Sequence, residues 1–258
     1  GAEYAEFVDL NKLGAVVTKG VANVPWPGNP TPRVAEVYGG MLNAVGLQNP
    51  GIDLFVERDI PFLKQFDTKI MVNVCGHSTE EYIEVVERLR DQPVDLLEIN
   101  ISCPNVKEGG IAFGQDPKAV EAITKEMKKH AAQPVIMKLS PNVTDITEMA
   151  RAAEAGGADG LSLINTITGM KIDINRQKFV LANKTGGMSG PAIHPVAVRM
   201  VYQTAQAVRL PIVGMGGIMN AEDAIEMILA GATAVSVGTA NFTNPHVTEE
   251  IVAGIRDY

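Results

Sequence analysis

Cys103 is the residue of this chain best placed for chemistry, because it directly follows a segment with the alternation of a strand. In residues 95–102 (DLLEINIS), leucine and isoleucine alternate with Glu98, Asn100 and a serine. The flanking segments read as strand–helix units, in which helices cover the sheet, so a polar strand face there indicates a function. Pro104 ends the strand and leaves Cys103 at its carboxyl end, where α/β folds carry active sites. The thiol is either an inert buried group or a general base favoured by alkaline pH, since its reference pKa is about 8.5.

Polar residues also end several other predicted strands. They are Lys19, Asn73, Asn100, Lys138, Asn165 and Thr166. One such Lys is often a surface residue, and one such Asn is often a turn former. Their recurrence on successive strands favours a shared site, because the carboxyl ends of parallel strands meet at one mouth. Lys138 could act there as a Schiff-base nucleophile or as a fixed positive charge beside a cofactor.

Two glycine-containing segments give a separate signal. GMGG at 214–217 precedes a predicted helix that begins at Asn220, and GTAN at 238–241 precedes the last helix. Glycines let a phosphate approach backbone N–H groups, and helix N-termini favour anions. These segments therefore predict a phosphorylated ligand or cofactor, with tight packing as the alternative reason for the glycines.

The elements that must position these residues alternate between strand and helix along a single domain, residues 1–258. Seven strands are predicted, at 15–20, 69–76, 95–102, 134–140, 160–166, 211–217 and 234–242. This is one strand short of an eight-stranded (β/α)8 TIM barrel, and we expect the absent strand to precede a first helix at 3–13. The segment 21–50 reads as a long functional loop, and 169–188 as a hairpin insertion.

Composition excludes several classes of function. The 258 residues carry a net charge of −8 without a basic cluster, which argues against nucleic acid. No apolar run approaches the ~20 residues of a membrane span, and the polar start does not resemble a signal peptide. Two cysteines make no disulfide framework, so a cytoplasmic location is expected. The four histidines lack a metal-binding spacing, so we predict no metal and place them at helix caps or the surface.

Longer motifs resemble one family. NISCPNVKEGGIAFG, preceded by GGMLNAVGLQNPG and followed by KLSPNV, INT, GGMSGPA, GMGGI and VGTANF, resembles the catalytic subunit of class 1B dihydroorotate dehydrogenases. The resemblance extends from about Glu3 to the last helix. It implies an FMN-containing (β/α)8 barrel that oxidises dihydroorotate to orotate in pyrimidine biosynthesis. FMN would lie at the C-terminal mouth, with its phosphate at the loops after the last two strands.

The resemblance also assigns roles to residues. Cys103 matches the base that takes a proton from C5 of dihydroorotate while C6 gives a hydride to flavin N5. The positions that match substrate-binding residues are Lys19, Asn43, Ala44, Val45, Gly46, Leu47, Asn100, Asn105, Asn165 and Thr166. Those that match FMN-binding residues are Lys19, Gly20, Asn73, Asn100, Lys138, Ile164, Gly190, Gly216, Gly217, Gly238 and Thr239. Lys138 would lie near flavin N1 and O2 and stabilise the negative charge of the reduced ring.

Two departures from the family pattern concern the cofactors. Family members begin with further residues that hold the first barrel strand and a turn touching FMN, and this sequence starts after them. Class 1B members also resemble one another in using a partner subunit with FAD and an iron–sulfur cluster to reduce NAD. This chain has no cysteine cluster, so those groups would belong to another chain. The GLQNPG and FGQDP motifs favour class 1B over the fumarate-using class 1A, and the resemblance implies a homodimer.

Three alternatives remain open at the level of sequence. The FMN barrel of dihydropyrimidine dehydrogenases, acting on uracil or thymine, is a close relative, but it tends to carry His where this chain has Asn105. A lyase or isomerase with Lys138 as Schiff base would use the glycine loops to hold a substrate phosphate. A non-catalytic barrel would bind no flavin.

Overall fold

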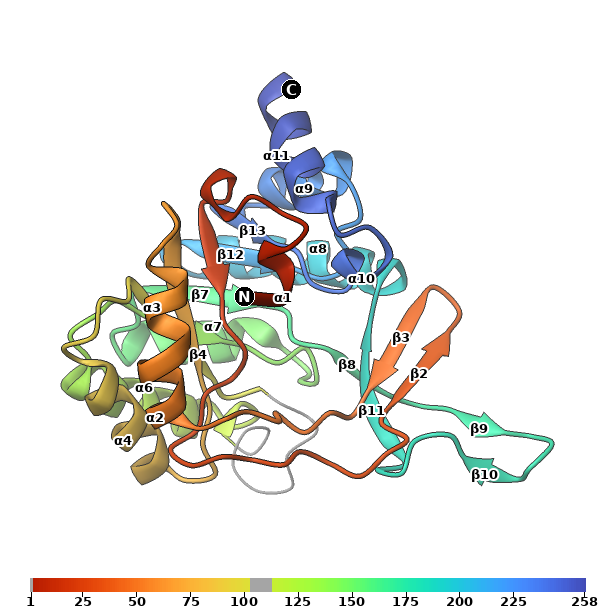
Figure 1. Ribbon diagram of the computed structural model, residues 1–258, viewed down its shortest axis with the longest axis horizontal. Coiled ribbons are helices and arrows are strands. Elements are labelled where there is room, and N and C mark those ends of the chain that lie inside the picture. Colours follow the sequence, from red (N-terminus) through yellow and green to blue (C-terminus); the bar gives the residue numbers. More distant parts are fainter. Residues whose placement is uncertain (1, 103–112) are drawn as a thin grey trace.

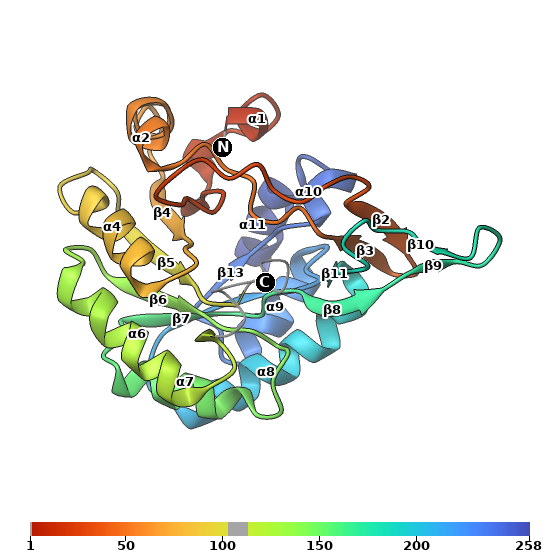
Figure 2. The same cartoon turned by 90° about the horizontal axis from the view of Figure 1, so that it is seen from below.

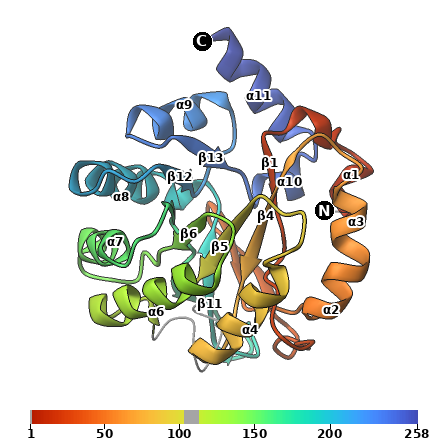
Figure 3. The same cartoon turned by 90° about the vertical axis from the view of Figure 1, so that its left-hand side faces the viewer.

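The computed structural model describes residues 2–102 and 113–258. Its main sheet has seven parallel strands. In spatial order they are β1 (Ala15–Val17), β4 (Lys69–Val74), β5 (Leu96–Asn100), β6 (Val135–Lys138), β7 (Gly160–Leu163), β12 (Ile212–Met215) and β13 (Ala234–Ser236). Figure 3 shows the strands curled inside a ring of helices. The predicted (β/α) barrel with seven strands is thereby confirmed.

Four of the main helices that cover the barrel begin at a side chain that caps them. The main ones are α4 (Thr79–Leu89), α6 (Pro117–His130), α7 (Ile146–Ala155), α8 (His194–Ala207), α9 (Ala221–Leu229) and α11 (Val247–Asp257). Ser78, Asp116, Asp145 and Asn220 each accept a hydrogen bond from a backbone N–H in the first turn of their helix. Among the described residues, no helix is both long and apolar enough to cross a membrane.

The N-terminal part of the barrel differs from the expectation. The predicted helix at 3–13 is two short pieces, α1 (Ala2–Ala5) and the 3₁₀ turn η1 (Leu10–Lys12). Asp9 separates them because its carboxylate accepts from the backbone N–H of Asn11, a local bond that competes with a continuous helix. The next helix is interrupted by a π-helical turn: α2 (Ile52–Leu54), η2 (Phe55–Asp59) and α3 (Ile60–Leu63).

A second, antiparallel sheet stands beside the barrel (Figures 1 and 2). Its strands lie in the order β2 (Val34–Val37), β3 (Gly40–Asn43), β11 (Thr185–Ser189) and β8 (Ile167–Met170). The segment 21–50, which we expected to be a loop, therefore contains a hairpin, whose proline- and glycine-rich flanks hide it in the sequence. The expected insertion at 169–188 is confirmed as the small hairpin β9 (Ile172–Asp173) and β10 (Lys178–Phe179), followed by β11.

The core lies between the barrel strands and their helices. Apolar residues of β4 and β5, such as Ile70, Val72, Leu97 and Ile99, are fully buried. Tyr82 of α4 is buried with them, and its hydroxyl donates to the carbonyl oxygen of Asn100 at 2.7 Å. The end of β5 is thus fixed to the helix that covers it.

The two outermost strands of the barrel, β1 and β13, each pair with one neighbour among the described residues. Glu249 of α11 connects the elements on these two sides. Its Oε1 accepts from the Asp9 backbone N–H at 2.9 Å, and its Oε2 accepts from Lys12 Nζ at 3.0 Å. These two hydrogen bonds, followed by the attraction of Lys12, lower the pKa of the Glu249 carboxyl.

This contact predicts an acid-sensitive contribution to stability. Because the folded-state pKa of Glu249 is lowered, its contribution is present above the ordinary Glu pKa of about 4.3 and is lost as pH falls through the lowered value. We expect Glu249→Gln to lower the melting temperature at pH 7 and the difference from wild type to shrink towards pH 3.5. Circular-dichroism melts across this range measure the difference. A difference that does not change with pH would contradict the prediction.

Candidate active site

Strand register gathers polar side chains on the inner face of the barrel. Asn73 of β4 lies opposite Glu98 of β5, and Lys138 of β6 lies between Asn100 of β5 and Ser162 of β7. Partners in a parallel ladder point to the same face of the sheet. The polar face that the sequence shows in residues 95–102 therefore points into the barrel, where neighbouring strands supply its partners.

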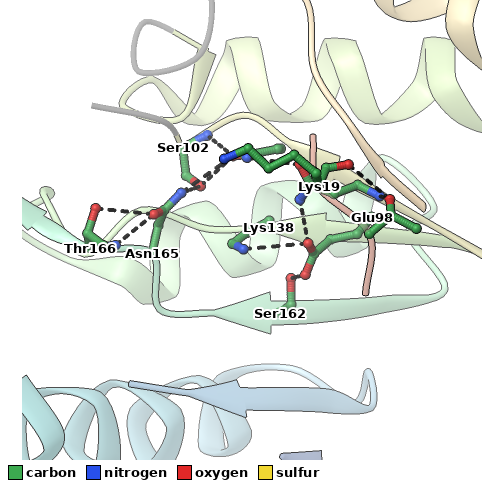
Figure 4. Close-up of polar contacts among 10 residues, drawn as sticks. Lys19, Glu98, Ser102, Lys138, Ser162, Asn165 and Thr166 are labelled. Atoms are coloured by element: carbon green, nitrogen blue, oxygen red, sulfur yellow. Dashed lines mark hydrogen bonds and ion pairs between the residues drawn. The ribbon is translucent and has the colours of Figure 1, made fainter. Parts of the chain in front are cut away.

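Glu98 is the centre of this polar layer (Figure 4). Its side chain is completely buried. One carboxylate oxygen accepts from Ser162 Oγ at 2.6 Å, and the other accepts from Asn73 Nδ2 at 2.5 Å and lies 3.5 Å from Lys138 Nζ. A carboxylate loses several kcal/mol of hydration when it is buried, so it is retained only with such partners. Sequence analysis noted Glu98 as polar but gave neither it nor Ser162 a role.

A chain of amide side chains leads from this layer to the mouth. Asn100 Nδ2 donates to Asn73 Oδ1 at 3.2 Å, and Asn165 Nδ2 donates to Ser102 Oγ at 2.8 Å. Asn165 Oδ1 accepts from the backbone N–H of Thr166 at 2.7 Å. Figure 4 shows the Lys19 side chain reaching towards Ser102 from the other side of the mouth. Each amide is thus oriented before any ligand binds.

A first cavity of about 210 Å³ opens between the last strands of the barrel and the second sheet. Its lining includes most of the positions that match FMN-binding residues, namely Lys138, Ile164, Gly190, Gly216, Gly217, Gly238 and Thr239. Gly216 and Gly217 have φ of 131° and 67°, values that L-residues rarely adopt. The predicted glycine loop is therefore a sharp turn along the cavity wall.

Gly238 differs from these glycines. Its φ is not in the positive region, and a Cβ added there would meet no described atom within 4 Å. Neither backbone conformation nor packing against described residues explains a glycine at this position. Close approach of a ligand to the backbone does explain it, and Gly238 lines the first cavity together with the Thr239 hydroxyl.

A second cavity of about 220 Å³ adjoins the first. It is lined by most of the positions that match substrate-binding residues, together with Gly20 and Asn73: Lys19, Gly20, Asn43, Val45, Gly46, Leu47, Asn73, Asn100, Lys138, Asn165 and Thr166. Ala44 is fully buried and does not line it. Because Lys138, Asn165 and Thr166 line both cavities, the two form one site.

The loop that follows β3 is held in an uncommon conformation. Leu47 has a φ of 53°, a strained value for a non-glycine residue that is concentrated at functional sites. The Leu47 carbonyl accepts from Asn49 Nδ2 at 2.8 Å, and buried Asn49 also accepts from the Ala22 and Gly51 backbone N–H groups. The loop is therefore fixed against the barrel by its own side chains.

Three sequence expectations about reactive residues have different outcomes. Cys103 and Asn105 lie outside the described residues. Cys75, which we took as structural, is buried in the barrel core. His194, which we placed at a helix cap or the surface, does cap the 3₁₀ turn η3 (Pro191–Ile193), but it is buried, because its ring packs between the Gly216 loop and α9.

Comparisons with known proteins agree with this geometry. The family described as "Dihydroorotate dehydrogenase" matches residues 1–258. The chain is 74% identical over 258 residues to the "Dihydroorotate dehydrogenase B (NAD(+)), catalytic subunit" of Lachnoclostridium phytofermentans, covering 100% of this chain and 86% of the relative. It is 57% identical over 254 residues to the protein of the same name from a Geobacillus species, covering 98% and 81%.

A solved structure supports the same fold. The crystal structure of DHODH from Eimeria tenella in complex with ferulenol superposes with a TM-score of 0.78 at 22% identity, covering 92% of this chain and 73% of that one. The fold and the family match define a (β/α) barrel oxidoreductase. The chain belongs to the dihydroorotate dehydrogenase family, and within it is similar to class 1B catalytic subunits. This membership decides against the Schiff-base lyase and the non-catalytic barrel.

The burial of the Glu98 carboxylate predicts strong energetic coupling between Glu98 and Lys138 inside the barrel. We expect Glu98→Gln and Lys138→Met each to destabilise the protein and the double variant to lose less than their sum, with a coupling energy of about 1–3 kcal/mol. The exposed pair of Arg88 and Asp53, whose atoms are 2.8 Å apart, is the control, with coupling below about 1 kcal/mol. Urea unfolding of the four proteins of each cycle measures both energies. Additive costs for Glu98 and Lys138 would contradict the prediction.

Proposed function

We propose that this protein catalyses FMN-dependent oxidation of dihydroorotate to orotate, as the NAD-linked type of the family. The observation that carries the proposal is the pair of adjoining cavities that share Lys138, Asn165 and Thr166. One is bordered by glycine turns suited to a phosphate, and the other by oriented amides suited to a pyrimidine ring. A flavin in the first and a pyrimidine in the second would meet at the shared residues.

The residues of the first cavity fit FMN. Gly238 leaves room for a phosphate beside the backbone, because an added Cβ there would meet no described atom within 4 Å, and the hydroxyl of Thr239 donates to Ser189 Oγ at 2.7 Å along the same wall. Lys138, fixed by Glu98, supplies a positive charge where the reduced ring gains negative charge. FMN, when bound, would supply a two-electron acceptor, which no amino-acid side chain in the cavity offers.

The second cavity would orient the substrate. Amide groups of Asn43, Asn100 and Asn165 can pair with the alternating N–H and C=O groups of dihydroorotate, and Lys19 can attract its carboxylate. Cys103, by its match to the family base, would remove the proton from C5 while the hydride leaves C6. The proton from C5 and the hydride from C6 together remove two electrons and two protons, which leaves orotate with its new C5=C6 double bond.

The electrons must then leave the chain. The relatives named above are NAD(+)-type catalytic subunits, and we propose that a partner subunit with FAD and an iron–sulfur cluster carries the electrons to NAD. The two cysteines of this chain are too few to hold such a cluster. We further propose that the catalytic chain forms a homodimer in the cytoplasm.

An absorption spectrum followed by anaerobic addition of dihydroorotate tests the proposal. We expect a flavin band that bleaches on addition of dihydroorotate and not of dihydrouracil. A band that bleaches only with dihydrouracil would favour a dihydropyrimidine dehydrogenase. If no flavin is bound even after FMN is added back, the proposed function is wrong.

Replacing the proposed base separates proton removal from flavin binding. We expect Cys103→Ala to lower the rate of flavin reduction by dihydroorotate roughly 100-fold or more and to leave FMN bound, since a general base typically contributes that much. Cys103→Ser should shift the remaining activity to higher pH, because a hydroxyl loses its proton less readily. Cys75→Ala, the matched control, should keep both flavin and turnover. Rapid turnover by Cys103→Ala would rule out this residue as the base.

A further inference from the structure

His194 at the start of α8 is buried between two other elements, with 8% of its surface exposed. Its Nδ1 lies 2.8 Å from the carbonyl oxygen of Gly216, in the turn after β12. Its Nε2 lies 3.2 Å from Glu226 Oε2 and 4.0 Å from Asp223 Oδ1, both on α9. The ring thus connects α9 to the glycine turn that borders the first cavity.

Hydrogen-bond chemistry fixes the direction of these contacts. A carbonyl oxygen only accepts, so Nδ1 carries a hydrogen and donates it to Gly216. Nε2 faces the carboxylates of α9, with Glu226 Oε2 at 3.2 Å. Asp223 is itself held, because its Oδ2 accepts from the Met219 backbone N–H at 2.8 Å. The ring therefore has one orientation, set by α9, in which it holds the Gly216 carbonyl.

The hydrogen bond to the Gly216 carbonyl also fixes the direction of the neighbouring Gly217 N–H. The carbonyl of Gly216 and the N–H of Gly217 belong to one planar trans peptide, in which they point in opposite directions. When His194 draws the Gly216 oxygen towards α9, the Gly217 N–H turns away from α9. Gly217 lines the first cavity, so a phosphate bound there could accept a hydrogen bond from an N–H turned in this way.

The turn needs such a restraint. Two successive glycines with positive φ have no side chains to hold their peptide, and glycine has the widest backbone freedom of all residues. The contact is also close: a Cβ on Gly217 would lie 2.8 Å from His194 Cβ and 2.7 Å from the Gly190 oxygen. His194 therefore supplies both packing and a directional bond at a point of the cavity wall that has no side chains of its own.

We propose that His194 is a positioning residue for the phosphate of the flavin, acting through the Gly216–Gly217 peptide. The inference rests on the proposed function, since it needs a phosphorylated flavin in the first cavity. It goes further because it assigns His194 to the phosphate and not to the rest of the ligand. Loss of the Nδ1 hydrogen bond should weaken the binding of FMN and leave the binding of riboflavin, which lacks the phosphate, unchanged.

Two variants isolate the two nitrogens of the ring. In His194→Asn the amide nitrogen is as many bonds from Cα as Nδ1, so it can still donate to Gly216. In His194→Gln the amide nitrogen is at the distance of Nε2, so the contact with Glu226 remains and the bond to Gly216 is lost. Arg199→Gln is the control. Arg199 lies on the same helix and lines, together with His194 and Glu226, a groove outside the first cavity, where its guanidinium donates to Gln203 Oε1 at 2.7 Å.

The full chain, freed of bound flavin, is titrated with FMN and with riboflavin by fluorescence quenching. A chelator is present so that no metal ion bridges His194 and the carboxylates of Asp223 and Glu226. We expect His194→Gln to raise the FMN dissociation constant roughly tenfold, the size of one directional hydrogen bond, with riboflavin unchanged. His194→Asn should stay within about threefold of wild type for both flavins.

Each other outcome has a defined meaning. Equal weakening of FMN and riboflavin by both variants would show a merely structural role and overturn the inference. The inference would also be overturned if His194→Gln bound FMN with the affinity of the wild type. A wild-type protein that binds neither flavin would instead contradict the proposed function, and the two failures are thereby distinguished.

Discussion

The burial of one carboxylate governs the organisation of this barrel. Glu98 has no access to water, so the surrounding strands must provide a cation and hydrogen-bond donors within a few ångströms. Lys138, Asn73 and Ser162 provide them from three different strands. The register that satisfies Glu98 also aims Lys138 and Asn73 at the mouth. The buried Glu98 carboxylate, whose burial costs stability, therefore fixes the side chains of Lys138 and Asn73 that line the cavities.

The mouth is completed by backbone more than by side chains. Glycine turns after the last strands form one wall, and the second sheet, built from two insertions between barrel strands, forms another. Amide side chains lie between them and are already hydrogen-bonded to one another. A site assembled in this way loses little conformational entropy when a rigid planar ligand enters.

Much of this arrangement could be predicted from the sequence. Polar residues at successive strand ends indicated the mouth, and the family resemblance assigned roles that the cavities are compatible with. What could not be predicted depends on contacts between distant residues. The role of Glu98 depends on the strand register that brings Lys138 next to it. The role of His194 depends on its contacts with Gly216 and with α9, which are distant in the sequence. The hairpin at 34–43 was missed because its partner strand, at 185–189, lies far away in the sequence.

That separation has a consequence for the order in which the protein folds. Asn43 pairs with Gly187, a contact that closes a loop of more than half the chain, whereas the barrel strands pair with near neighbours. Contacts of long sequence separation form late, since the entropy of loop closure is lost before they stabilise anything. The barrel floor with Glu98 can therefore form early, and the substrate loop after β3 becomes ordered only when nearly the whole chain is in place. A folding intermediate would have a finished charge network and no binding site for a pyrimidine.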